Sequence, residues 1–260
     1  MKLSVILIGY DSWHFLDKSL ASISFLDKNL DSEVIYIDNG SGDGSFLKTR
    51  EHYPWVRVLK NNWNEGISVA RNQGMKQAVG DYILLLDSDT EVTKEALDAM
   101  LAFMEEHPEV GLCGCKMYGQ DGSVQDSCRP FPSIRGKIKA GFQILAKKLH
   151  LPVSKTGAYY DKEAAEPFEV DYVIGACQLI RKEALQKVGW LDEKIFYGPE
   201  DADFCLRMKR AGYPVYYLPQ TAIYHAYQRV SSHRIFSRLN KKHIQGLLYY
   251  FWKHRIRKKA

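Results

Sequence analysis

The chain has 260 residues, a formal net charge of +5 and 45% hydrophobic residues. This composition excludes a disordered chain and indicates a globular protein that can bury a sizeable core. No apolar run reaches the roughly 18 residues that a membrane-spanning helix needs. We interpret the apolar N-terminus, LSVILIGY, as a strand rather than a signal peptide. The five cysteines form no CxxC pair, which favours reduced, buried thiols in a cytoplasmic protein.

The positive charge is concentrated in two segments. Residues 229–260 contain ten Lys or Arg residues and no Asp or Glu, and residues 135–155 also lack acids. The rest of the chain is therefore net acidic. This asymmetry indicates an anionic surface or ligand near the two basic segments.

The first half of the chain alternates between two kinds of apolar pattern. Short runs rich in β-branched and aromatic residues predict strands at 3–8, 34–37, 56–59 and 82–86. Helical spacing of apolar residues follows at about 16–23, 67–78 and 97–107. This alternation predicts a mostly parallel α/β sheet with helices on both faces. Ligands bind such sheets at the carboxyl ends of the strands, which is where we find Tyr10-Asp11, Asp38-Asn39 and Asp87-Ser88-Asp89.

The second half of the chain is less regular. We expect an amphipathic segment over 134–149 and a strand over 172–180, around Gly175-Ala176. Helices are predicted from about residue 200 to 211 and from about residue 241. No internal repeat or low-complexity linker is present, so we predict one domain with a C-terminal extension.

Asp87 and Asp89 flank a single residue, Ser88, at the end of a very hydrophobic predicted strand. Two carboxylates this close repel each other, and burying either without a partner is unfavourable, so we expect a cation between them. Mg²⁺ and Mn²⁺ take oxygen ligands and usually bind one or two carboxylates together with substrate phosphates. The alternative is that the pair caps the following helix and complements its dipole.

Two glycine-containing segments near the predicted strand ends have both a functional and a structural interpretation. Residues 37–45 form a Gly-rich turn that opens with Asp38, and such a turn is either a ligand contact or a solvated loop. Residues 61–74 place Gly66 before a helix that carries Arg71. That helix start is either a nucleotide contact or an ordinary helix entry with a surface arginine.

Two further features also have both a functional and a structural interpretation. They are the acidic start of the helix near residue 200 and a single histidine. Glu200 and Asp201 either take part in a reaction or complement the helix dipole. His225, after a strand-like run, is either a metal ligand or a structural residue. Asp203 is expected to pair with Arg207 one turn later and to be structural.

Together, these segments resemble family 2 glycosyltransferases of the GT-A fold. The resemblance covers residues 1 to about 232, and its matching stretches are VILIGY, VIYIDNGSGDGS, NEGISVARNQGMKQAVGDYILLLDSDT, VIGACQLIRKEAL, GWLDEKIFYGPEDADFCLRMKRAGY and His225. Within the family, the sequence looks most like bacterial rhamnosyltransferase-type enzymes of surface polysaccharide synthesis. One departure is Gly9, where relatives often carry Asn or Ser, and it leaves the contacts of the first loop open.

The resemblance implies a GT-A (Rossmann-like) catalytic domain over 1–232. Its nucleotide-binding half would be 1–115 and its acceptor-binding half 116–232. The implied reaction is an inverting, metal-dependent transfer of a sugar from a nucleotide diphosphate sugar to a hydroxyl of a glycan or lipid-linked saccharide. We expect dTDP-rhamnose as the donor, with a UDP-hexose or UDP-N-acetylhexosamine as the next choice.

The resemblance also implies roles for individual residues. Asp201 would be the general base, and Asp89 and His225 would bind Mn²⁺ or Mg²⁺. Acceptor contacts are implied for Glu200, Gly175, Ala176 and Trp190. Asp38 would read the pyrimidine base, and nucleotide contacts are implied for Tyr10, Asp38, Asn64, Gly66, Arg71, Asp87 and Ser88.

Residues 233–260 form a basic, amphipathic extension. Ile244, Leu247, Leu248 and Phe251 share a helical face, and KHRIRKK follows without an acid. This pattern is typical of a helix at an anionic membrane surface, which would make the protein cytoplasmic and peripheral on the inner face of the cell membrane. The alternative is that the helix packs on the catalytic domain or on a second subunit of a homodimer.

Three other functions are less consistent with the sequence. A catalytically silent nucleotide-sugar or glycan-binding module would lack a metal or base position, and none of Asp87, Asp89, Asp201 and His225 is missing. A nucleic-acid binder would need a recognition helix or stacking sheet, and we find neither. A nucleotidyltransferase would need an early Gly-rich phosphate loop with a basic residue, which GYDSWHFL does not offer.

Overall fold

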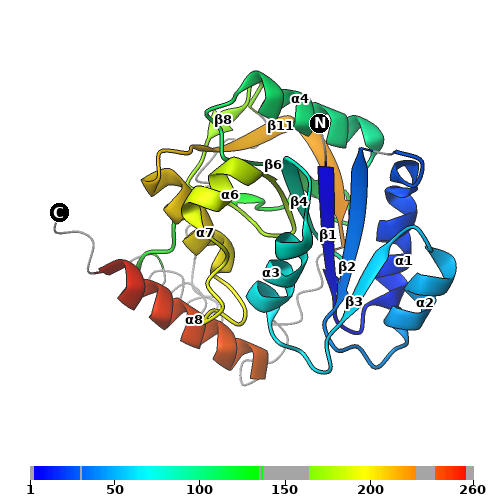
Figure 1. The fold of residues 1–260 in the computed structure, drawn as a ribbon. Coiled ribbons are helices and arrows are strands. Elements are labelled where there is room, and N and C mark those ends of the chain that lie inside the picture. Colours follow the sequence, from blue (N-terminus) through cyan, green and yellow to red (C-terminus); the bar gives the residue numbers. More distant parts are fainter. Residues whose placement is uncertain (1–2, 30, 135, 137–163, 227–237, 256–260) are drawn as a thin grey trace.

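The computed structural model describes residues 3–29, 31–134, 136, 164–226 and 238–255. Most of the predicted amphipathic segment at 134–149, and most of the basic stretch at 135–155, lies outside these residues. The fold is an α/β sheet with helices packed against it, as predicted (Figure 1). All five cysteines are buried and none of them forms a disulfide, which confirms the prediction of buried thiols. None of the helices that the structure describes is long and apolar enough to cross a bilayer.

The first four strands form the parallel half of the sheet. They are β1 (Leu3–Gly9), β2 (Ser32–Asp38), β3 (Arg57–Lys60) and β4 (Tyr82–Asp87), in the order β3-β2-β1-β4. The register pairs Gly9 with Asp38 and Ile8 with Asp87, so the polar residues after these strands emerge at one edge. The four predicted strands are therefore confirmed, and their ends converge as expected.

Helices cover both faces of the parallel half. On one side lie α1 (Trp13–Ser22) and α2 (Ser45–His52), and on the other lies α3 (Ile67–Gln77) (Figure 1). Gly74 of α3 sits directly on Ile6 of β1, because a Cβ atom at Gly74 would lie 2.3 Å from Ile6 Cγ2. The next helix, α4 (Lys94–Glu106), is capped by Thr93, whose hydroxyl accepts from the Ala96 N–H.

The second half makes the sheet mixed. The order continues from β4 through β10 (Cys177–Arg181), β6 (Leu112–Tyr118) and β11 (Val215–His225) to β5 (Thr90–Glu91), and β8 (Phe168–Glu169) pairs with β11. Strand β10 is antiparallel to both β4 and β6. A separate two-stranded sheet joins β7 (Cys128–Arg129) to β9 (Tyr172–Val173). Two helices follow, α6 (Lys182–Val188) and α7 (Glu200–Arg210).

The single strand predicted over 172–180 was wrong. The chain forms β9, turns at Gly175 and continues as β10 in the other sheet. At this turn the Gly175 carbonyl accepts from a side chain, Arg71 Nη2, at 2.8 Å, and a Cβ atom at Gly175 would lie 2.3 Å from Arg71 Nη1. Apolar content alone did not reveal that a glycine inside this run marks the close approach of a distant side chain.

The structure describes the C-terminal helix α8 over Arg238–Arg255, where a helix from about residue 241 was predicted, and the helix packs against α7. Asp203 of α7, fully buried, anchors it by bonding Lys253 at 2.7 Å and His254 at 2.8 Å. Asp203 also bonds Arg207 at 2.9 Å, which confirms the predicted pair. Tyr250 is buried in the same contact. One face of the helix therefore packs on the catalytic domain, which is the alternative interpretation given for this extension above.

Candidate active site

A cluster of two carboxylates and an imidazole lies at the carboxyl edge of the sheet. Asp87 ends β4, Asp89 follows it, and His225 ends β11. Thr90 of β5 pairs with His225 of β11, and the Ala226 N–H donates to the Asp89 carbonyl at 2.8 Å. One ligand atom from each of the three side chains lies within 4.8 Å of the others, and His225 Nε2 is 3.4 Å from Asp89 Oδ1. Residues 136 positions apart in sequence thus form one candidate metal centre.

Asp87 and Asp89 of the cluster border a first cavity of about 460 Å³. We refer to it as the donor cavity, because it lies between the predicted nucleotide contacts. It is lined by Ile8, Gly9, Tyr10, Asp11, Ser12, Asn39, Asn64, Gly66, Ile67, Asp87, Ser88, Asp89, Phe196, Tyr197 and Leu239. Tyr10, Asn64, Gly66, Asp87 and Ser88 of the predicted set are therefore brought together, although their contacts with a nucleotide remain a prediction.

Asp38 does not line the donor cavity. It is fully buried, and its Oδ1 accepts from the Ser41 N–H at 3.1 Å, so its contact with a base remains a prediction. The next residue, Asn39, reaches the cavity instead and donates to Asn64 Oδ1 at 3.2 Å. Sequence reasoning noted Asn39 only as part of a strand end and assigned it no role, since an Asn in a Gly-rich turn has no distinguishing spacing.

A second cavity, of about 390 Å³, lies on the other side of the carboxylates. Asp201, Glu200, Gly175 and Ala176 line it, as the resemblance implied for the acceptor side, and we call it the acceptor cavity. Trp190 does not line it and is 42% exposed in the loop between α6 and α7. The two cavities share four lining residues, namely Ile67, Asp87, Asp89 and Tyr197. They therefore meet at the candidate metal centre.

Arg71 lines the acceptor cavity and bonds Asp87, a residue that lines both cavities. Its guanidinium is 1% exposed and bonds Asp87 Oδ1 at 2.6 Å, Glu200 Oε1 at 3.2 Å and the Gly175 carbonyl at 2.8 Å. The planar fork of arginine suits this division between two carboxylates. The structure thus gives Arg71 carboxylate and carbonyl partners, and the nucleotide contact predicted for it remains a prediction.

Glu200 and Asp201 start α7 in a strongly desolvated position. Burial, followed by the negative charge of Asp201, raises the pKa of Glu200, and burial raises the pKa of Asp201. Asp201 accepts weakly from the Gly175 N–H at 3.4 Å. Carboxylates whose pKa values are raised toward neutral pH are suited to proton transfer.

Helix α8 contributes to both cavities, which the sequence did not indicate. Leu239 lines the donor cavity, and His243 and Leu247 line the acceptor cavity. The helix approaches closely at Gly246, where a Cβ atom would lie 2.6 Å from the Gly198 carbonyl oxygen. An amphipathic tail pattern indicates a helix but does not indicate which residues it covers.

Comparison with known proteins gives the class. Residues 4–189 match the sequence model of Glycosyl transferase family 2, and the chain belongs to this family of glycosyltransferases.

Solved structures agree on the GT-A fold. A mannosyltransferase from Pyrobaculum calidifontis, in complex with GDP-Man and Mn²⁺, matches with a TM-score of 0.66 and 17% identity, over 100% of this chain and 65% of that one. TarS 1–349 from S. aureus, in complex with UDP, matches with a TM-score of 0.61 and 22% identity, over 86% of this chain and 60% of that one.

Curated relatives include rhamnosyltransferases. The N-acetylglucosaminyl-diphospho-decaprenol L-rhamnosyltransferase of Mycobacterium tuberculosis (strain ATCC 25618 / H37Rv) is 30% identical over 86% of this chain and 75% of its own length. Rhamnosyltransferase WbbL of Escherichia coli (strain K12) is 25% identical over 97% of this chain and 93% of its own length. The chain is thus a rhamnosyltransferase-type member of the family, which confirms the resemblance.

Proposed function

We propose that this protein transfers rhamnose from dTDP-rhamnose to a hydroxyl of a lipid-linked saccharide, in one displacement that inverts the anomeric carbon. The observation that carries this proposal is the junction of the two cavities at Asp87 and Asp89, with Asp201 on the acceptor side. A donor in one cavity and an acceptor in the other would meet at this junction. The rhamnosyltransferase relatives support rhamnose as the transferred sugar, and the M. tuberculosis relative, whose name includes a diphospho-decaprenol, supports the acceptor.

The three-residue cluster fits a divalent cation. Asp87, Asp89 and His225 offer two carboxylates and one imidazole, which is a suitable donor set for Mn²⁺ or Mg²⁺ beside a diphosphate. Such an ion, when bound, neutralises the diphosphate as it leaves. Asp89 and His225 would hold the ion directly, and Asp87 would share it or contact the ribose.

The acceptor side supplies the proton transfer. Asp201 takes the proton from the acceptor hydroxyl as the hydroxyl oxygen attacks the anomeric carbon, and the carbon–oxygen bond to the diphosphate breaks. Glu200 is 5% exposed, and its Oε2 has no hydrogen-bond partner among the described residues. A buried carboxylate oxygen of this kind is suited to accept a hydrogen bond from an acceptor hydroxyl and so to orient it. Arg71 keeps Glu200 and Asp87 at a fixed separation.

A donor panel tests this function. We expect release of free dTDP from dTDP-rhamnose in the presence of Mn²⁺ or Mg²⁺ and loss of that release with a chelator, because the ion and the diphosphate share one site. Asp89→Ala is expected to abolish the release at the same protein concentration. The measurement is nucleotide release across dTDP-, UDP- and GDP-sugars. Turnover of a UDP-sugar alone would overturn the donor, and chelator-resistant turnover would overturn the metal.

The outer face of α8 supports a membrane partner. Ile244, Leu248 and Trp252 recur every four residues and are 55%, 65% and 61% exposed. The chain from residue 229 onward contains no acid. Aromatic and aliphatic side chains among basic residues suit the interface of an anionic membrane. Since the inner face of α8 lines both cavities, we propose a peripheral enzyme whose acceptor cavity opens beside the cytoplasmic leaflet.

A triple variant tests the membrane surface. Ile244→Ser, Leu248→Ser and Trp252→Ser together are expected to reduce binding to phosphatidylglycerol vesicles at least tenfold, because apolar burial at the interface is lost. Nucleotide release from the donor is expected to persist, since the three side chains point outward. The control is Leu47→Ser, another exposed apolar residue, at 65% exposure. The result that would overturn the membrane proposal is a wild-type protein that does not bind these vesicles at low salt but forms a dimer that the triple variant does not form. The outer face of α8 would then be a subunit interface.

A further inference from the structure

Gln125 contacts the predicted metal ligand His225 at two points. Its Nε2 donates to the His225 carbonyl at 2.7 Å, and its Oε1 lies 2.8 Å from His225 Nδ1. The two residues are 100 positions apart, and Gln125 carries no sequence signal that would connect it to a metal site. One side chain thus holds both the backbone and the ring of the same residue.

The chemistry of these two bonds fixes the orientation of the amide. A backbone carbonyl can only accept, so the NH₂ group of Gln125 must face the His225 carbonyl. The amide oxygen then faces Nδ1, and because this oxygen can only accept, Nδ1 must carry the proton. A flipped amide would place its oxygen against the His225 carbonyl oxygen and lose that bond, even where its NH₂ group donated to an unprotonated Nδ1.

The other ring nitrogen then faces the candidate metal centre. With the proton of the Nδ1–H tautomer on Nδ1, the ring lone pair is on Nε2, the nitrogen that lies 3.4 Å from Asp89 Oδ1. A lone pair and a carboxylate oxygen at this distance repel unless a positive charge lies between them. The bond from Gln125 therefore prepares His225 to be a ligand through Nε2.

We propose that Gln125 is a positioning residue that selects the Nδ1–H tautomer of His225 and directs Nε2 toward a divalent cation. The inference rests on the metal site of the proposed function. Histidine ligands of metals commonly donate their second N–H to a carbonyl or carboxylate, and this bond fixes the ring and raises its basicity. Here an amide oxygen takes that place.

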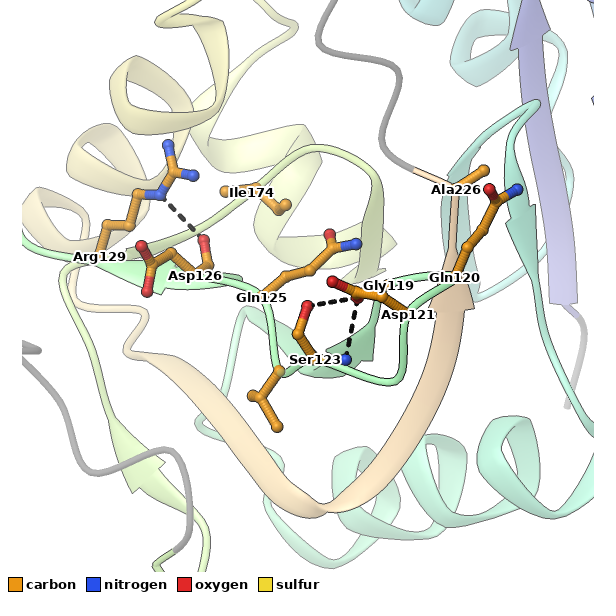
Figure 2. A pocket seen from close by; sticks show the side chains of 10 residues that line it. Gly119, Gln120, Asp121, Ser123, Gln125, Asp126, Arg129, Ile174 and Ala226 are labelled. Carbon is orange, nitrogen blue, oxygen red and sulfur yellow. Dashed lines mark hydrogen bonds between the residues drawn. The ribbon is translucent and has the colours of Figure 1, made fainter.

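The local structure keeps Gln125 in register with the metal centre. Its N–H donates to the Met117 carbonyl of β6 at 2.9 Å, and its carbonyl accepts from Ser127 at 3.0 Å. Strand β6 pairs in turn with β11, which carries His225. Figure 2 shows Gln125 on the segment that returns from the turn at Gly119 and Asp121, beside a polar cavity. Gln125 and His225 are thus attached to neighbouring strands of one sheet.

Binding of MnCl₂ alone tests the role in affinity. The electron paramagnetic resonance signal of free Mn²⁺ measures the bound fraction. Gln125→Met removes both hydrogen bonds at similar length, and we expect Mn²⁺ affinity to fall about 10- to 100-fold, the usual effect of losing such an outer partner. Gln125→Glu keeps an acceptor for Nδ1–H and is expected to lose less. The control is Gln120→Met, in the turn of the same hairpin, which is expected to bind as the wild type does.

The tautomer of His225 provides a second, metal-independent measurement. Long-range ¹H–¹⁵N spectra of histidine-labelled protein, assigned with His225→Ala, should show Nδ1–H in the wild type and in Gln125→Glu, and a shift toward Nε2–H in Gln125→Met. Mn²⁺ affinity within about threefold of wild type in a folded Gln125→Met variant, with the tautomer unchanged, would overturn the inference. Wild-type protein that shows the Nδ1–H tautomer but binds no Mn²⁺ would instead overturn the metal site and leave the effect of Gln125 on the ring supported.

Discussion

Asp201→Asn is expected to lower kcat by about 10²- to 10⁴-fold, the usual contribution of a general base. The substitution keeps the shape of the side chain, and the single oxygen of Asn can still accept from one of the two backbone N–H groups, those of Ala202 and Gly175, that the carboxylate bonds. It removes the ability to take a proton from an acceptor hydroxyl. Mn²⁺ and dTDP binding, measured by calorimetry, are expected to remain within about twofold of wild type, because Asp201 lines only the acceptor cavity.

The pH profile provides an independent check on this role. Burial raises the pKa of Asp201, and a base must be deprotonated to act. The rate of the wild type is therefore expected to fall as the pH decreases through a value above the ordinary 3.9 or so of aspartate. Any acid limb that belongs to Asp201 is expected to disappear in Asp201→Asn. Mutant transfer activity within about threefold of wild type would assign the base to another residue.

The sequence predicted the parts of the fold that depend on local periodicity. Strands β1, β2 and β4 are buried runs of apolar residues, and their polar ends had to converge because parallel strands finish at one edge. Asp87 and Asp89 were found by this reasoning alone. The resemblance, not the periodicity, placed His225 beside them. The sequence of β11, the strand that positions His225, is only partly an apolar run.

The parts that the sequence did not predict depend on contacts between distant residues. The turn at Gly175 lies against Arg71, 104 positions away, which bonds the Gly175 carbonyl and fills the space where a side chain would lie. Gln125 reaches His225 only because β6 and β11 are neighbours in the sheet. The register of strands so far apart in sequence is set by packing, which no short stretch of sequence specifies.

The prediction of the C-terminal helix was incomplete for the same reason, because its packing depends on residues distant in the sequence. Its amphipathic pattern predicted an apolar face but not the partner of that face. In the structure, Asp203 selects one side of the helix through Lys253 and His254, and this leaves Ile244 and Leu248 on the outside. Sequence periodicity therefore identified the helix, while buried charges determined its orientation.

Arg71→Met is expected to lower the free energy of unfolding by about 3–5 kcal/mol, because it leaves two carboxylates without their buried cation. Arg71 is bonded to Asp87 and Glu200, and the Glu200 side chain is 6% exposed in that pair. Urea unfolding measures the loss, which is large against the 5–15 kcal/mol of a typical domain. Arg71→Lys keeps a positive charge and is expected to lose less than Arg71→Met. It is still expected to lose some stability, because one ammonium cannot hold both carboxylates and the Gly175 carbonyl in a planar fork.

The pH dependence of that loss identifies its cause. The pKa of Glu200 is already raised by burial, and removing the Arg71 charge raises it further. The folded variant then binds more protons than the unfolded chain, so its stability falls as the pH rises, and the deficit against wild type is expected to shrink as the pH falls from 8 toward 5. Adding Glu200→Gln to Arg71→Met removes one of the unpaired charges and is expected to restore part of the stability. A deficit below about 1 kcal/mol, or one that stays constant over this pH range, would show that Arg71 does not hold the two carboxylates together by charge.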